Sequence, residues 1–234
     1  VKQHTIADKI PAVLLSGGLD SFLVSREIQK NFDNLKSFSI GFKNPTYDET
    51  STIKKLNLNF EKKYFYPNSK DFSYFFSKMS KLIDEPMGDS SLLPTYIVFD
   101  KVKKHTNVAI GGDGGDENFF GYITFDAFYL ASIIKKIFPK MLFKIISKIS
   151  KILPNSSNYM SLSFRLKKFF EGINYKKNYI NTFWLSSLNQ KELEFYFNEK
   201  INIEEILPEL DVLFSKRKSN IKLCQLYYFK YYLP

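Results

Sequence analysis

The chain has 234 residues, 44% of them apolar, which suits a globular protein with one large core or one core plus a helical appendage. No run of eighteen apolar residues occurs and no apolar leader opens the sequence, so we expect neither a spanning helix nor a secretory signal, and a cytoplasmic location. The single cysteine, Cys224, excludes an internal disulfide and a zinc site of several cysteines, and its apolar surroundings predict a buried, inert thiol.

The formal net charge of +10 is concentrated in residues 122–180, where eleven Lys and Arg residues stand against Asp126 and Glu171. Such a basic segment can bind nucleic acid or an anionic membrane. The lysines between residues 140 and 151, however, repeat at helical spacing opposite an apolar stripe, which is more typical of a solvated helix face. We therefore expect no specific nucleic-acid partner and no membrane partner.

The first predicted element is a short buried strand over residues 11–15, followed by the turn Ser16-Gly17-Gly18-Leu19-Asp20-Ser21 and a helix over residues 20–32. Glycines at the carboxyl end of a strand let backbone N–H groups close around a phosphate, and the dipole of the next helix favours an anion there. The turn therefore predicts a pyrophosphate-binding loop. A glycine-rich turn that binds nothing is the alternative.

The side chains of this loop suit the same interpretation. The hydroxyls of Ser16 and Ser21 can add hydrogen-bond donors, and Asp20 can hold a metal ion that shares the phosphate charge. The loop has no lysine after its glycines and lacks the G-x-G-x-x-G spacing, so it belongs to neither of those two nucleotide-binding patterns.

Strands and helices then alternate, which predicts an α/β fold with a doubly wound parallel sheet and ligands at the carboxyl ends of its strands. Asp48 and Glu49 are expected in the first turn of the second helix, where acidic side chains suit the helix dipole. The expected elements are strands over residues 35–40, 62–66 and 108–110 and helices over residues 48–58, 71–83 and 92–104, the second of these helices being stopped by residues 84–86.

A second glycine loop, residues 111–117, follows the last predicted strand and carries Asp113, Asp116 and Glu117. Carboxylates near a triphosphate require Mg²⁺, because bare anions repel one another. We predict Asp20 and Asp116 as its two protein ligands. A calcium-binding turn or a merely hydrated acidic turn is the alternative.

From residue 122 onward, strand signals disappear and the apolar residues follow helical spacing, with Phe138-Pro139 expected to separate two helices. The sequence thus predicts a nucleotide-binding α/β core over residues 1–121 and a helical C-terminal half over residues 122–234.

The S-G-G-x-D-S loop resembles the PP-loop of the ATP pyrophosphatases, and the chain resembles the synthetase domain of the glutamine-hydrolysing asparagine synthetase family over nearly its whole length. Four motifs in the same order carry this resemblance and make it far more specific than the loop alone. They are residues 13–21, residues 37–42 with 47–49, residues 84–91, and residues 111–117 with 121–122.

The resemblance implies an enzyme that forms asparagine from aspartate, ammonia and ATP through a β-aspartyl-adenylate, with Mg²⁺. By the same resemblance, Asp113, Asp116 and Glu117 would be catalytic, Asp113 being linked to adenylate formation. The nucleotide would be held by Leu14, Ile40, Gly111 and Gly112 around the adenosine, by Ser16, Gly17, Gly18 and Ser21 around the pyrophosphate, and by Asp20.

The chain also departs from the family pattern. The family usually begins with a cysteine-nucleophile glutaminase domain, so we expect such a domain as the ammonia-supplying partner in a longer protein, and a homodimer is possible. The family also continues past Pro234 into a segment with a lysine needed for adenylation, so we expect this chain by itself to be incomplete for catalysis. Tyr228 replaces a common Asp, and Gly111 stands where Ser is common.

Two rival functions stay open. One is a different PP-loop enzyme, such as a relative that amidates or cyclises another carboxylate, or one that modifies tRNA. The other is a nucleotide-binding homologue without catalysis. The absence of paired cysteines and the acidic second loop argue against tRNA modification, and the presence of Asp20, Asp113 and Asp116 argues against a homologue without catalysis.

Overall fold

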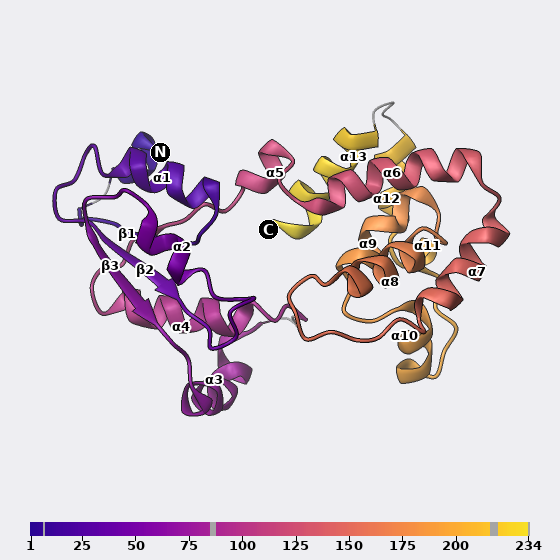
Figure 1. Cartoon of the computed structure of the whole chain (residues 1–234), viewed down its shortest axis with the longest axis horizontal. Coiled ribbons are helices and arrows are strands. Elements are labelled where there is room, and N and C mark those ends of the chain that lie inside the picture. Colours follow the sequence, from indigo (N-terminus) through magenta and orange to yellow (C-terminus); the bar gives the residue numbers. More distant parts are fainter. Residues whose placement is uncertain (7, 85–87, 216–219, 234) are drawn as a thin grey trace. The chain divides into compact units, whose positions relative to one another are not determined.

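The computed structural model describes residues 1–6, 8–84, 88–215 and 220–233 (Figure 1). The chain divides into two compact units, Val1–Asp113 and Gly114–Pro234. This division assigns Asp113 to the first unit and Asp116 and Glu117 to the second.

The first unit is an α/β unit, as the alternating pattern predicts. Its elements in chain order are the 3-10 turn Lys2–Thr5, β1 (Ala12–Leu14), α1 (Leu19–Ile28), β2 (Lys36–Ile40), α2 (Thr50–Lys55), β3 (Glu61–Phe65), α3 (Ser69–Leu82), α4 (Leu92–Lys103) and β4 (Ala109–Ile110). Among the described residues the strands form one sheet in the order β3-β2-β1-β4, and every pairing is parallel. The predicted parallel sheet is confirmed.

Successive residues of β1 pack into different core clusters, because successive side chains of a strand point to opposite faces of the sheet. Val13 packs in one cluster with residues of α1 and α2, whereas Ala12 packs with Phe38 and with Val102 of α4. Figure 1 accordingly shows α1 and α4 on opposite sides of the sheet. The chain order reverses between β1 and β4, which is where a doubly wound sheet opens a crevice at its carboxyl edge.

Several helix boundaries differ from their predictions: α1 ends at Ile28 and not at residue 32, and α2 ends at Lys55 and not at residue 58. The start of the second helix differs as well. We expected Asp48 and Glu49 inside the first turn of the second helix, but α2 begins at Thr50 and has no acidic residue in its first turn. The carboxylate of Asp48 instead accepts hydrogen bonds from the Phe42 N–H (3.1 Å) and from the Thr50 hydroxyl (2.7 Å). These bonds lower the pKa of Asp48, the Thr50 bond most, and they fix the chain just before the helix.

The third predicted helix ends at Leu82, close to its predicted end. Most of the predicted stop, residues 84–86, and part of the motif over residues 84–91 fall on residues 85–87, which lie outside the described residues.

The second unit is helical. Its elements are α5 (Gly115–Phe119), α6 (Ile123–Ile137), α7 (Lys140–Ser150), α8 (Leu162–Gly172), the 3-10 turn Lys177–Tyr179, α9 (Ile180–Leu185), α10 (Gln190–Phe197), α11 (Ile203–Ile206), α12 (Pro208–Ser215), α13 (Asn220–Tyr227) and the π-helical turn Tyr228–Tyr232. As predicted, Phe138-Pro139 separates two helices, α6 and α7. No helix among the described residues is long and apolar enough to cross a membrane.

The core of this unit is rich in aromatic side chains and encloses the single cysteine. Phe125, Phe128 and Phe143 are buried in one cluster with Cys224, whose side chain is fully buried. Burial raises the pKa of the Cys224 thiol to about 12, although a hydrogen bond from Asn181 opposes the shift. The predicted buried thiol is confirmed.

The apolar stripe of α7 is only partly used for packing. Phe143 is buried, but Met141, Ile145 and Ile149 are 72%, 45% and 59% exposed. The interpretation of this stripe as the cover of a core therefore holds for only part of the helix.

Candidate functional site

The loop after β1 is closed by its two serine hydroxyls. The Ser21 hydroxyl oxygen accepts from the Ser16 N–H (3.2 Å) and lies 2.8 Å from the Ser16 hydroxyl oxygen. The Ser16 hydroxyl also accepts from the Gly18 N–H (3.2 Å). Both predicted hydroxyls therefore lie inside one tight turn, and Gly18 forms the N-cap of α1.

An internal carboxylate already occupies part of this turn. The Gly17 N–H donates to a carboxylate oxygen of Glu49 at 3.0 Å. The turn also opens the ten-residue helix α1, whose first N–H groups have no partner within the helix and whose dipole favours negative charge. An anionic oxygen thus fits the site where the loop was predicted to hold phosphate.

The loop after β4 touches the loop after β1. A Cβ added to Gly112 would lie 2.7 Å from the Ser21 backbone nitrogen and 3.2 Å from the Asp20 carbonyl carbon, closer than real Cβ contacts allow in the first case. Residue 112 must therefore be glycine for the two loops to meet. A Cβ at Gly111 would lie 2.8 Å from a carboxylate oxygen of Asp113, so that side chain folds back over its own loop.

The remaining predicted nucleotide contacts lie at the carboxyl ends of neighbouring strands. Leu14 ends β1 and Ile40 ends β2, and both are partly buried. The ring of Tyr66 covers Gly41, where an added Cβ would lie 2.3 Å from a ring carbon. The structure thus brings the first-unit residues of the predicted site to one edge of the sheet.

Asp116 and Glu117 belong to α5 of the second unit, where they make local contacts. Glu117 is 3% exposed, and its carboxylate accepts a hydrogen bond from the Tyr122 hydroxyl at 2.8 Å. Burial and this bond raise the pKa of Tyr122 well above its usual range. Asp116 packs against Gly121, where an added Cβ would overlap its carboxylate.

Tyr228, which stands where the family pattern often has Asp, is a core residue here. Its side chain is 1% exposed, its ring stacks on Tyr122 with 4.8 Å between ring centres, and its hydroxyl shares a hydrogen bond with Thr124. Residue 228 therefore contributes to the packing of the core and brings no charged side chain to this position.

The possible metal ligands at the loops are few. Among the described residues, no group of three or more His, Cys, Asp or Glu side chains is placed to hold a metal ion. Mg²⁺ on a nucleotide usually takes only one or two protein carboxylates, with phosphate oxygens and water completing its shell. Asp20 lies in the first turn of α1, beside the loop predicted to bind pyrophosphate, so it is placed to be one such carboxylate ligand.

Glu49 is the site residue that sequence reasoning missed. It lies 32 positions from Gly17 in the chain, and its acidic neighbour Asp48 suggested a helix start instead. One signal was present, because Asp48 and Glu49 follow the second strand at the same carboxyl edge as the other loops.

Comparisons with known proteins agree with this architecture. The sequence model of the asparagine synthase family matches residues 1–212. A putative asparagine synthetase (glutamine-hydrolyzing) 2 of Methanocaldococcus jannaschii is 35% identical over 214 residues, which cover 90% of this chain and 38% of that protein. Asparagine synthetase (glutamine-hydrolyzing) 1 of Bacillus subtilis is 30% identical over 129 residues, 52% of this chain and 20% of that protein.

A third relative, a putative asparagine synthetase (glutamine-hydrolyzing) of Mycobacterium bovis, is 27% identical over 172 residues, 70% of this chain and 26% of that protein. The chain thus spans well under half the length of these relatives. With a family match that covers most of its residues and with the expected parallel sheet, the chain belongs to the asparagine synthase family.

Proposed function

We propose that this chain is the nucleotide-binding, amide-forming part of an ATP-dependent carbon–nitrogen ligase. The observation that carries the proposal is the contact between the two glycine loops, where Gly112 approaches the backbone of Ser21 without room for a Cβ. This contact places a second backbone loop against the N-terminus of α1, the kind of site that binds phosphate. The relatives named asparagine synthetase support the reaction class.

The proposed reaction has two steps. An oxygen of the substrate carboxylate attacks the α-phosphorus of ATP, the bond from that phosphorus to the β-phosphate bridge breaks, and pyrophosphate leaves. Ammonia then attacks the carbonyl carbon of the acyl-adenylate, AMP leaves with the carboxylate oxygen, and the nitrogen loses a proton to solvent. We propose aspartate as the substrate, with ammonia supplied by a glutaminase domain, as the relatives' names suggest.

In this proposal the protein acts mainly by positioning and by electrostatics. The N–H of Gly17 and the hydroxyls of Ser16 and Ser21 release their internal partners and bind phosphate oxygens, which stabilises charge on the leaving pyrophosphate. Asp20 would hold Mg²⁺, which would neutralise phosphate charge. Asp116 as a second ligand, and catalytic roles for Asp113, Asp116 and Glu117, stay predictions from the sequence.

Calorimetric titration with Mg²⁺ and ATP tests the binding step. We expect Ser16→Ala to weaken binding about tenfold to a hundredfold, because a hydrogen bond to a charged group contributes on the order of 1.5–3 kcal/mol. Ser73→Ala is the matched control, since Ser73 is exposed on α3 and its hydroxyl donates to the Ser69 carbonyl, away from the glycine loops. Absence of binding heat on folded protein would contradict the proposal.

Exchange of labelled pyrophosphate into ATP tests the chemical step. For a chain extended past Pro234 by the lysine-bearing segment of the family pattern, the proposal expects exchange that depends on aspartate and is not supported by glutamate or succinate. Exchange driven by another carboxylate would favour a relative with a different substrate. Nucleotide binding without any exchange would favour a nucleotide-binding homologue without catalysis.

A further inference from the structure

Helix α7 of the second unit carries more apolar surface than its packing uses. It packs on α8, and its buried residues are Phe143 and Ser150. Met141, Ile145 and Ile149 are exposed instead. Figure 1 shows α7 at one edge of the helical unit. The proposed reaction uses none of these side chains, so their exposure needs another explanation.

The exposed side of α7 is divided between apolar and cationic side chains. Each residue turns an α-helix by about 100°, so Met141, Ile145 and Ile149 lie within an arc of roughly 80°. The lysines of the helix occupy the adjacent arc, of about the same width. They are Lys140, Lys144 and Lys148. We call these six residues the α7 face.

The α7 face lies in the most basic part of the chain. Residues 127–170 contain nine Lys and Arg residues and no Asp or Glu. Lys144 and Lys148 are exposed, and no ion pair found among the described residues involves them. The α7 face therefore presents positive charge directly beside apolar surface.

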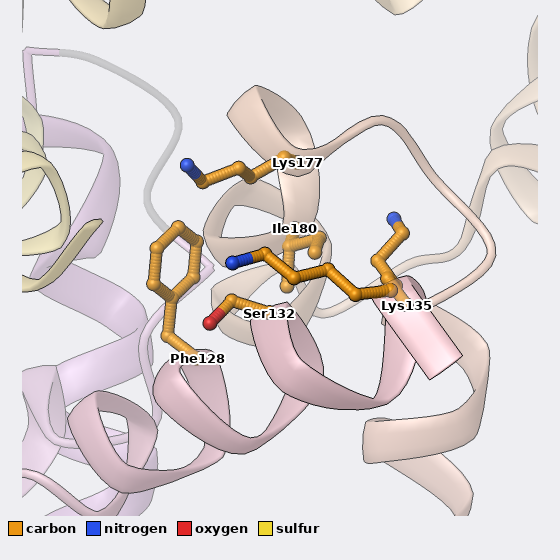
Figure 2. Close-up of a pocket in the computed structure, with 6 residues that line it drawn as sticks. Phe128, Ser132, Lys135, Lys177 and Ile180 are labelled. Atoms are coloured by element: carbon orange, nitrogen blue, oxygen red, sulfur yellow. The ribbon is translucent and has the colours of Figure 1, made fainter. Parts of the chain in front are cut away.

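Other lysines of the same basic segment are used inside the helical unit. Lys135 lines a small pocket together with Phe128 and Ile180 (Figure 2), and its ammonium donates to the Tyr175 carbonyl. Lys135 is also partly buried. It therefore serves the interior of the unit, whereas the lysines of the α7 face are open to an external partner.

The composition of the α7 face argues against a protein or a nucleic acid as that partner. Protein interfaces are depleted in lysine and enriched in aromatic residues and arginine, whereas the α7 face consists of lysine, methionine and isoleucine. A second copy of the chain would bring lysines against lysines. Nucleic acid binds through phosphate contacts to cations, which would leave the apolar half of the face without a partner.

An anionic lipid surface matches both halves of the face. A helix with lysines beside an apolar surface is typical of helices that lie in the membrane interface. The boundary between headgroups and acyl chains accepts apolar side chains, and the flexible stems of lysines let their ammonium groups reach the lipid phosphates.

We propose that the α7 face docks on the surface of an anionic lipid bilayer. Met141, Ile145 and Ile149 enter the boundary between headgroups and acyl chains, and the lysines contact the lipid phosphates. The helix lies along the surface and does not span the bilayer. Our expectation of no membrane partner rested on the apolar stripe as the cover of a core, and the exposure of these three residues removes that reason.

Co-sedimentation of the whole chain with lipid vesicles tests the proposal. One set of vesicles contains equal parts of phosphatidylglycerol and phosphatidylcholine, and the other contains phosphatidylcholine alone. We expect binding to the anionic vesicles that weakens as salt is raised, and little binding to the neutral ones, because salt screens the attraction between lysines and anionic lipids.

The cationic half of the face is tested by the double variant Lys144→Gln, Lys148→Gln. We expect it to bind anionic vesicles about twentyfold more weakly, because each lysine near an anionic surface contributes about fivefold. The matched control is the double variant Lys55→Gln, Lys191→Gln, which removes two exposed lysines from α2 and α10.

The apolar half is tested by Ile149→Gln. We expect this variant to bind about fivefold to twentyfold more weakly, because the burial of an aliphatic side chain is lost. Ile206→Gln is the matched control, since Ile206 is 58% exposed and Ile149 is 59% exposed. All the substituted side chains are exposed, so we expect every variant to keep the circular dichroism spectrum and Tm of the unsubstituted chain.

Losses in both α7 variants, with both controls unchanged, support the proposal. It is overturned if the folded chain does not bind anionic vesicles, if the controls lose as much binding, or if Ile149→Gln binds as the unsubstituted chain does. Self-association that Ile149→Gln abolishes would assign the face to a second copy, and tighter binding of RNA than of vesicles at the same salt would assign it to nucleic acid. Either result would also overturn the proposal.

Discussion

Replacing Gly112 by alanine should damage the first unit and its nucleotide binding together. The added Cβ would lie 2.7 Å from the Ser21 backbone nitrogen and 3.1 Å from its Cα, and both are backbone atoms that no side-chain rotation can move away. Overpacking of this kind typically costs about 1–3 kcal/mol. For a chain of this length that cost lowers Tm by roughly 2–12 °C.

The same clash pushes the second loop away from the N-terminus of α1. We expect Mg²⁺·ATP binding by Gly112→Ala to weaken about tenfold or more, because one or two hydrogen bonds to a charged phosphate are lost. Differential scanning calorimetry gives the stability change, and isothermal titration at a temperature where the variant is fully folded gives the affinity.

Gly18→Ala is a matched control for the stability change only, because Gly18 itself lies in the predicted pyrophosphate loop. A Cβ at Gly18 would meet the Ser16 hydroxyl oxygen at 3.3 Å, a side-chain atom that has to shift by only a few tenths of an ångström, and the φ of −79° at Gly18 suits alanine. Stiffening the unfolded chain stabilises by about 0.4–1 kcal/mol, while alanine is a poorer N-cap than glycine by roughly 0.5–1 kcal/mol, so the stability of Gly18→Ala should change by less than about 1 kcal/mol. If Gly112→Ala melted and bound ATP as the unsubstituted chain does, the close approach of the two loops would be refuted.

Three further predictions concern single side chains. Glu49→Gln should strengthen ATP binding about fivefold, as measured by calorimetry. The reason is that ATP no longer displaces a carboxylate from the Gly17 N–H, which removes a charge repulsion of roughly 1 kcal/mol between Glu49 and the phosphates. Weaker ATP binding by this variant would show that the Glu49 carboxylate contributes to nucleotide binding. Cys224 should react with a thiol reagent such as Ellman's reagent at pH 8 only after unfolding, because its thiol is fully buried with a pKa near 12; rapid reaction of the native chain would contradict the buried position. The folded pKa of Lys135, about 8, lies below its unfolded value of 10.5, so the unfolded state binds more protons between these values and stability should rise with pH there. Urea unfolding at pH 7.5 and 9.5 should show a smaller rise for Lys135→Gln than for Lys144→Gln, and an identical rise in both would exclude Lys135 as its source.

Local patterns determine much of this fold, and those parts could be predicted. The apolar run before Ser16 and the alternation after it are local signals, so the strands and the helix that opens at the glycine turn were predictable. The contact of Gly112 with Ser21 follows from topology, because adjacent parallel strands end at the same edge.

Contacts between distant segments could not be predicted in the same way. The bond between Gly17 and Glu49 depends on how far the loop after β2 reaches back, which no local pattern encodes. The exposure of Met141 on α7 depends on which neighbouring helix packs there. Helical spacing therefore predicted the apolar stripe of α7 but not which of its residues another helix covers. The burial of Glu117 against Tyr122 likewise depends on tertiary packing.

The position of β3 at an edge of the sheet has a consequence for aggregation. An edge strand presents unpaired backbone groups that can pair with another chain, and charged side chains on such a strand oppose this. β3 begins with Glu61, Lys62 and Lys63 in succession, and Glu61 lies 3.7 Å from Lys36 and 3.8 Å from Lys63. A strand from another chain that paired with β3 would have to desolvate these charges, so we expect this edge of the sheet to disfavour pairing between copies of the protein.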